Sequence, residues 1–166
     1  MSVSRLAFLF PLFTSLFSLA NFANAHVYLK NNKASVGEDY QAVFVVPHGC
    51  GASATVGLRV QVPEGVNNVQ AQAPVGWQLN VVEDEAAGSD AQTRVKEVAW
   101  RGGVLPSDET GEFVFSATLS QSLKANSILY FPAIQECEDG LIRWIDRPGA
   151  GQSEDDLDTP APALHL

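Results

Sequence analysis

Apolar and polar residues alternate with a period of two along much of the chain after residue 26. The clearest case is the stretch 54–62, where Val56, Leu58 and Val60 occupy alternate positions ahead of the turn Pro63-Glu64-Gly65. Successive side chains of a strand point to opposite faces, so this spacing predicts strands with one buried face. Similar stretches occur at 27–29, 41–46, 77–82, 95–100, 112–119, 128–134 and 141–145, and the tail 160–166 is a candidate edge strand.

The number and spacing of these strands favour one architecture. About eight or nine short strands separated by turns, without an amphipathic helix, predict an all-β antiparallel sandwich. Two stretches lack the alternation: we predict an acidic hairpin loop at 83–93 and a surface loop at 149–159. No repeat and no domain boundary follows Ala25, so residues 26–166 are expected to form one domain.

Residues 1–25 have the composition of a secretory signal peptide. Arg5 precedes an apolar run over 6–20, and the small-residue site Ala23-Asn24-Ala25 follows. We therefore predict cleavage after Ala25 and a periplasmic or secreted protein whose first residue is His26. The apolar run is short for a membrane span and no second long one follows, so we expect no membrane span in the mature chain.

A histidine at the mature N-terminus has a chemistry that an internal histidine lacks. Its free amine and its imidazole belong to one residue, so both nitrogens can bind one metal ion and close a chelate ring. The amine titrates near ~8 and the imidazole near ~6.5, so both offer lone pairs close to neutral pH. Such a nitrogen pair suits Cu(II) among the first-row ions. His26 is thus a candidate metal ligand, the alternative being that it merely follows the cleavage site.

The charge of the chain limits its partners. The sequence carries 19 acidic residues against 10 basic ones, a net charge of −9, and loses one more positive charge when Arg5 leaves with the signal. Nucleic acids and anionic membrane surfaces require basic patches, so neither is an expected partner. An acidic surface concentrates cations, although it also simply keeps an exported protein soluble.

Cys50 and Cys137 are the only cysteines of the sequence. In an oxidising compartment an even pair of cysteines favours a disulfide, which here would close most of the domain. The alternative is a thiolate pair for Cu(I). The sequence has no CxxC motif and no methionine after Met1, and both observations favour the disulfide.

Two further residues near these cysteines are candidates for a metal site. His48 lies in the turn Pro47-His48-Gly49-Cys50-Gly51, which the disulfide would hold steady, and is either a second imidazole ligand or a turn histidine bonded to a carbonyl. Trp144 follows Cys137 by seven positions in a short strand. Its indole either lies against the cation, where it would attract the charge and exclude water, or fills the core. Trp77 and Trp100 are assigned to the core.

The remaining donor is expected to be a carboxylate, and spacing does not choose among the eligible acids. These are Glu38, Asp39, Glu136, Glu138, Asp146, Glu154 and Asp155.

Several segments of the chain resemble the YcnI-type copper-binding family. They are the His-Val that follows the signal, Val-Pro-His-Gly-Cys at 46–50, Leu-Arg-Val-Gln-Val-Pro-Glu-Gly-Val at 58–66, Leu-Tyr-Phe-Pro-Ala-Ile-Gln-Glu-Cys at 129–137, Arg-Trp at 143–144 and Pro-Ala-Pro-Ala-Leu at 160–164. The likeness covers nearly the whole of residues 26–166.

This resemblance implies an immunoglobulin-like β-sandwich and an exported protein of copper homeostasis. It also implies a Cu(II) site made by the amine and imidazole of His26, a carboxylate and a tryptophan, for which Trp144 is the match. The family's acid has no clear counterpart, because His48, Gly49 and Cys50 stand where some relatives carry a glutamate. Whether His48 replaces that acid stays open.

The sequence therefore predicts a copper chaperone or carrier that is not an enzyme. Its expected partners are the copper ion and either another periplasmic copper chaperone or a membrane copper transporter. Two alternatives remain: a copper-dependent oxidase acting on a polymer, in which His48 would complete a two-histidine site, and a metal-free adhesion or assembly module on the same sandwich.

Overall fold

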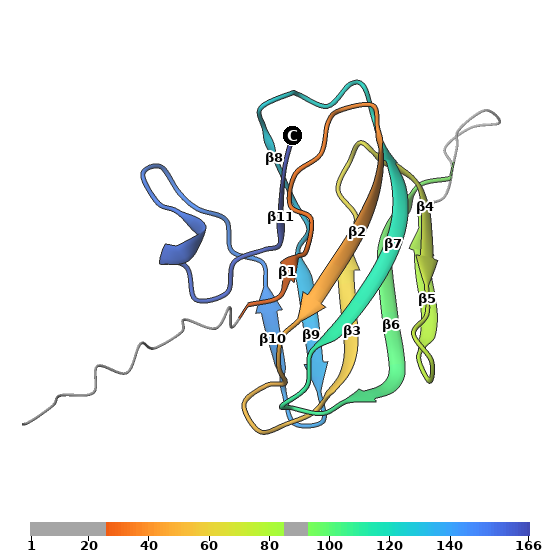
Figure 1. The fold of residues 1–166 in the computed structure, drawn as a ribbon, viewed down its shortest axis with the longest axis vertical. Helices are drawn as coiled ribbons and strands as arrows, with labels where there is room; N and C mark the ends of the chain where they lie inside the picture. Colours follow the sequence, from red (N-terminus) through yellow and green to blue (C-terminus); the bar gives the residue numbers. More distant parts are fainter. Residues whose placement is uncertain (1–25, 85–92) are drawn as a thin grey trace, which may run out of the picture.

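Two antiparallel sheets packed face to face form the body of the protein (Figure 1). The computed structural model describes residues 26–84 and 93–166. The first sheet has the order β1 (Tyr28–Leu29), β2 (Asp39–Val46), β7 (Gly111–Leu119) and β4 (Val66–Gln72). The second has the order β10 (Leu141–Trp144), β9 (Ala133–Cys137), β3 (Thr55–Gln61), β6 (Val95–Leu105) and β5 (Gln78–Glu83). The predicted all-β antiparallel sandwich is confirmed.

The core is built where alternate residues of the two sheets meet. Phe44 of β2 is fully buried and lies against Trp100 of β6, Phe115 of β7 and Phe131, with ring centroids 5.5–6.5 Å apart. Trp100 is also fully buried, and its indole N–H donates to the carbonyl oxygen of Gln72 at 2.7 Å. The assignment of Trp100 to the core is confirmed. Trp77 is only half-buried and packs edge-on against Phe113 at the rim.

Strand β4 was not predicted, because its sequence hides the alternation. The segment 66–72 is rich in Asn and Gln, and only Val66 is fully buried. Its pairing with β7 shifts register between Asn67 and Gln70, and Asn68 has a positive φ of 54°. An irregularity of this kind adds a residue to one strand, so inward-facing positions no longer fall at every second place.

The predicted strand 128–134 is two strands that belong to different sheets. β8 (Ile128–Tyr130) pairs with β11 (Ala163–His165), whereas β9 begins at Ala133 in the second sheet. Pro132 separates the two, and proline has no N–H to continue a ladder. The tail prediction is confirmed: β11 is a strand at the edge of a two-stranded sheet, and its residues Ala163 and Leu164 are buried.

The disulfide between Cys50 and Cys137 is present and joins residues 87 positions apart, with their Cα atoms 6.1 Å apart. It ties the turn that follows β2 to the end of β9, and the prediction is confirmed. The backbone of Cys50 also exchanges two hydrogen bonds with Ser53, at 3.0 and 3.2 Å, so the turn is held from both sides.

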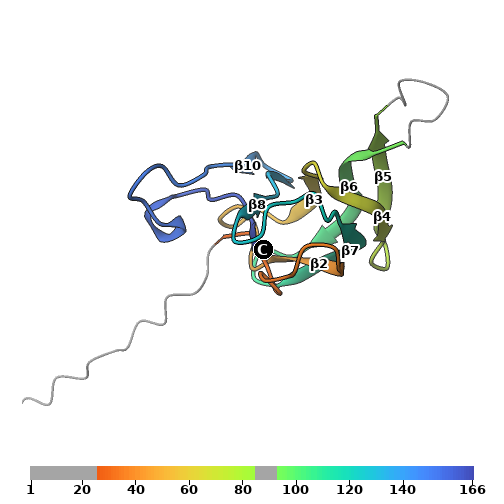
Figure 2. The ribbon, with the colours of Figure 1, turned by 90° about the horizontal axis from the view of Figure 1, so that it is seen from above.

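The segment 146–160, called here the 146–160 loop, leaves the sandwich after β10 and projects beside the start of β1 (Figure 2). It contains one short 3-10 helix, η1 (Glu154–Asp156), within the surface loop that the sequence predicted at 149–159. The carboxylate of Asp156 accepts hydrogen bonds from the N–H and hydroxyl of Ser153, at 2.7 and 2.8 Å, which closes this turn.

The predicted signal peptide, residues 1–25, and positions 85–92 of the predicted acidic hairpin loop lie outside the described residues. Among the residues that are described, no helix has the length and apolar character needed to cross a membrane.

Candidate metal site

His26 stands at the entrance to the first sheet. The next residue, Val27, is 1% exposed, and β1 follows with Tyr28 paired to Val45 of β2. His26 itself is partly exposed. Its backbone is therefore anchored by buried neighbours, while its side chain reaches the surface.

The imidazole of His26 lies against the indole of Trp144. The two ring centroids are 5.6 Å apart and the rings are inclined by 59°. Trp144 ends β10 in the second sheet and is 3% exposed. The structure thus brings together two of the predicted site residues, which are 118 positions apart in the sequence: His26 precedes β1 of the first sheet, and Trp144 ends β10 of the second.

Behind Trp144 lies a buried polar network centred on Gln135. The indole N–H of Trp144 donates to Oε1 of Gln135 at 3.1 Å. The amide nitrogen of Gln135 donates to the hydroxyl of Thr55 and to the carbonyl oxygen of His48, both at 2.8 Å. Gln135 and Thr55 are 1% and 0% exposed.

Sequence reasoning missed Gln135, although it carried a signal. The inward positions of β9 are 133, 135 and 137, and the other two hold Ala133 and Cys137. A polar residue at a position that alternation assigns to the core needs hydrogen-bond partners there, because an unpaired buried amide is costly.

His48 contacts Gly49 through its ring and Gln135 through its backbone carbonyl. Nδ1 of its ring lies 2.6 Å from the carbonyl oxygen of Gly49. Within residues 26–84 and 93–166 no hydrogen bond or ring contact joins His48 to His26. This arrangement matches the turn histidine that the sequence left open, and a role for His48 as a ligand stays a prediction.

A surface hollow of about 180 Å³ opens beside His26. Its polar lining comes from His26, Asn32, Glu154 and Asp155, and its walls come from β1 and residues 160–163. Two of the seven eligible acids therefore share a hollow with His26. Among the others, Glu136 bonds Arg101 at 3.0 Å, Asp39 accepts from Thr118 at 2.9 Å and Asp146 accepts from Thr159 at 2.6 Å.

The 146–160 loop that carries these two acids is held at its base. The N–H groups of Ile145 and Asp146 both donate to the carbonyl oxygen of Thr159, at 3.1 and 3.0 Å. The guanidinium of Arg147 lies over the ring of Tyr130, 5.3 Å from its centroid. The pKa of Tyr130 is raised, chiefly by burial and next by the Glu154 carboxylate, whereas Arg147 lowers it.

The described part of the chain contains no group of three or more His, Cys, Asp and Glu side chains close enough to hold a metal ion. A site made by the backbone amine and the imidazole of one histidine would not form such a group, because it uses only one side chain for two donor atoms.

Residues 26–166 match a family described as a domain of unknown function, DUF1775. The chain belongs to this family. It is the family of YcnI-type proteins, so the resemblance seen in the sequence is confirmed at that level. No curated protein matches the chain.

The fold has a counterpart among solved structures. The crystal structure of an uncharacterized protein from Nocardia farcinica, described as having an immunoglobulin-like fold, is similar with a TM-score of 0.66 and 28% identity. The similarity covers 85% of this chain and 97% of that chain. The DUF1775 domain of this protein is therefore an immunoglobulin-like β-sandwich, as the resemblance implied.

Proposed function

We propose that the mature protein is an exported carrier or chaperone of copper that binds Cu(II) through the amine and imidazole of His26. The observation that carries the proposal is the contact of the His26 imidazole with the buried indole of Trp144. A partly exposed histidine supported by a fixed aromatic ring is suited to holding a cation that must later be handed on.

Cleavage after Ala25 is the event that completes the ligand pair. Before cleavage the nitrogen of His26 belongs to an amide, and only the imidazole is a good donor. After cleavage the amine is free and can close the chelate ring. The family match covers 26–166, the same residues as the predicted mature chain, which supports this boundary.

We assign the further donor to Glu154 or Asp155. Both line the hollow that His26 lines, and both belong to a loop whose base is hydrogen-bonded to itself. Two nitrogens and a carboxylate oxygen form a donor set that suits Cu(II). The ring of His48, in contrast, lies against the carbonyl of Gly49 and is the less favoured donor.

Trp144 contributes an aromatic ring that attracts cations and excludes water. A cation near an indole ring gains attraction worth about 0.5–2 kcal/mol, depending on how much water is excluded. The ring is buried on its far side, so it keeps one flank of the imidazole away from solvent. The acidic charge of the chain adds a general attraction for cations.

The decisive experiment compares the protein beginning at His26 with the same protein acetylated at the His26 amine. We expect the first to bind one Cu(II) per chain in calorimetric titration, with a Kd at least about tenfold lower than that of the acetylated form. Acetylation removes the amine as a donor and leaves the imidazole in place. Equal affinities of the two forms would refute the chelate.

A further inference from the structure

We propose that Gln135 is the positioning residue of the His26 site. Its side-chain amide fixes the orientation of the Trp144 indole, and the His26 imidazole contacts that indole. This inference rests on the proposed function for its copper readout, but the positioning itself is a property of the metal-free protein.

The hydrogen bonds of Gln135 allow only one orientation of its amide. The indole nitrogen of Trp144 can only donate, so the atom facing it at 3.1 Å must be the oxygen of Gln135. The carbonyl oxygen of His48 can only accept, so the atom facing it at 2.8 Å must be the amide nitrogen. Flipping the amide would break both bonds, and the observed arrangement is therefore fixed by its partners.

This network decides which part of the indole meets His26. Because the indole N–H is already bonded to Gln135, it is not available to His26 or to a ligand in the hollow. The contact at 5.6 Å between the centroids is then a tilted contact of the two rings, made without the indole N–H. Without the bond, the indole could rotate about its side-chain torsions and lose this contact.

The placement of Gln135 argues for more than filling space. It is 1% exposed between Ala133 and Cys137, where an apolar side chain would satisfy the core without hydrogen bonds. Its three bonds join β10, through Trp144, to β3, through Thr55, and to the turn after β2, through His48. One amide therefore holds the indole that contacts His26 to two other segments of the fold.

The test uses Gln135→Leu, which removes all three bonds at similar size. Thr55→Val is the matched control, because it deletes a buried partner of Gln135 but leaves the bond to Trp144. Both are expected to lower stability, so stability alone does not separate them. Only Gln135→Leu should release the indole.

Two measurements report the indole. In the metal-free protein, NMR follows hydrogen exchange of the Trp144 indole N–H, assigned by its loss in Trp144→Phe, and the ring-current shift on the His26 ring protons. In the Cu(II) form, titration and electron paramagnetic resonance report affinity and ligand field. For Gln135→Leu we expect faster exchange, loss of the His26 shift and a Kd raised about 10-fold or more, the usual cost of losing an outer-sphere partner. Thr55→Val should keep the parent spectra.

The outcomes separate the two proposals. A folded Gln135→Leu protein with unchanged exchange, unchanged His26 shifts and unchanged Kd would overturn the positioning role. If that variant does not fold, Gln135→Ala replaces it, since it also removes all three bonds, and parent behaviour there would overturn the positioning role equally. If the parent protein binds no Cu(II), the proposed function fails, while the metal-free NMR still decides whether Gln135 sets the His26–Trp144 contact.

Discussion

Removal of the disulfide should cost this domain a large part of its stability while leaving the His26 site in place. The perturbation is the double variant Cys50→Ala/Cys137→Ala. The bridge closes a loop of 87 positions, and Cys137 is 7% exposed on the inner face of β9. In the chain-entropy treatment such a loop stabilises the folded state by ~4.5 kcal/mol, because the cross-link removes conformations from the unfolded chain.

This magnitude is large against the ~5–15 kcal/mol by which folded domains usually exceed their unfolded states. The assay is equilibrium unfolding in urea at neutral pH, followed by tryptophan fluorescence. We expect the midpoint to fall and the slope m to rise, because the unfolded chain without the cross-link exposes more surface. The copper affinity of the folded variant should stay within about threefold of the parent, since the bond between Gln135 and Trp144 does not pass through either sulfur.

Reduction of the parent protein with a thiol provides the control, because it opens the bridge without changing side-chain volume. Agreement between reduced parent and double variant would assign the loss to the cross-link rather than to the two alanines. A loss below about 1 kcal/mol in both would refute the loop-entropy reasoning and would mean that the unfolded chain is already compact around this pair.

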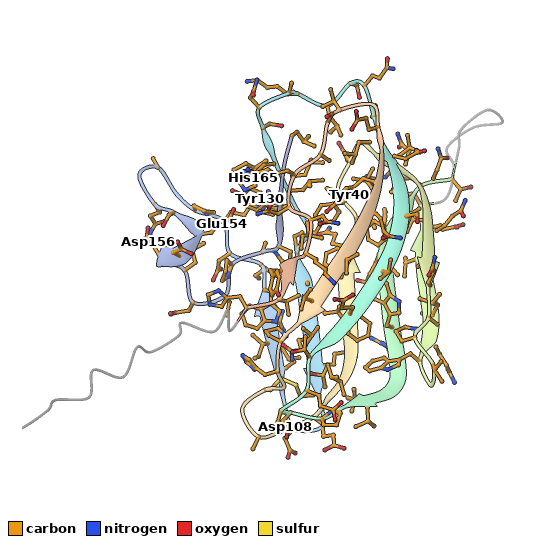
Figure 3. The ribbon with its side chains drawn as sticks, viewed as in Figure 1. Tyr40, Asp108, Tyr130, Glu154, Asp156 and His165 are labelled. Atoms are coloured by element: carbon orange, nitrogen blue, oxygen red, sulfur yellow. A yellow bond between two sulfur atoms is a disulfide. The ribbon has the colours of Figure 1, made fainter. Side chains whose placement is uncertain are left out.

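The remaining predictions address the donor, the charges and the core. Glu154→Gln/Asp155→Asn should raise the Kd for Cu(II) about tenfold in titration, whereas Asp108→Asn/Glu109→Gln, an equal charge change on an exposed turn distant from Glu154 (Figure 3), should leave it unchanged. Hydrogen bonds from Lys96 and Arg94 lower the pKa of Asp84, so its contribution to stability is present above the unfolded pKa and lost as pH falls. In urea unfolding at a series of acidic pH values, the free energy of unfolding of Asp84→Asn should therefore fall less steeply with decreasing pH than that of the parent. Equal slopes for the two proteins would contradict this. Phe44→Ala, which empties the contact with Trp100, Phe115 and Phe131, should cost about 3–5 kcal/mol in the same assay, and a cost below 1 kcal/mol would show that the core collapses into the space.

The strands with regular alternation could be predicted from sequence, because burial of one face leaves a direct trace in the residue order. Val56, Leu58 and Val60 identify β3 without further information. β4 could not be found in this way, since Asn68 at positive φ and the register shift beside it remove the period of two. The division of 128–134 was equally hidden, because a change of sheet leaves no compositional mark beyond Pro132.

The site residues could be predicted where their role depends on nearby sequence, and not where it depends on contacts between distant segments. His26 could be singled out because its chemistry depends only on the cleavage site that precedes it. Trp144 was named from its place after Cys137, and the structure sets it beside His26. The sequence could not show which acid lies near His26, because residues 149–159 have no alternation of apolar and polar positions. The position of this segment beside β1 depends on contacts such as Asp146 with Thr159 and Arg147 with Tyr130.

Under the proposed function, the position of His26 separates folding from completion of the copper site. Val27 and Leu29 are buried and β1 pairs with β2 through Tyr28, so the sheet needs the chain only from residue 27 onward. The amine of His26 forms no part of the core, and its release changes one donor atom rather than the packing. An uncleaved precursor should therefore fold to the same sandwich and yet bind Cu(II) weakly. Copper binding would then begin only after export, where the signal is removed.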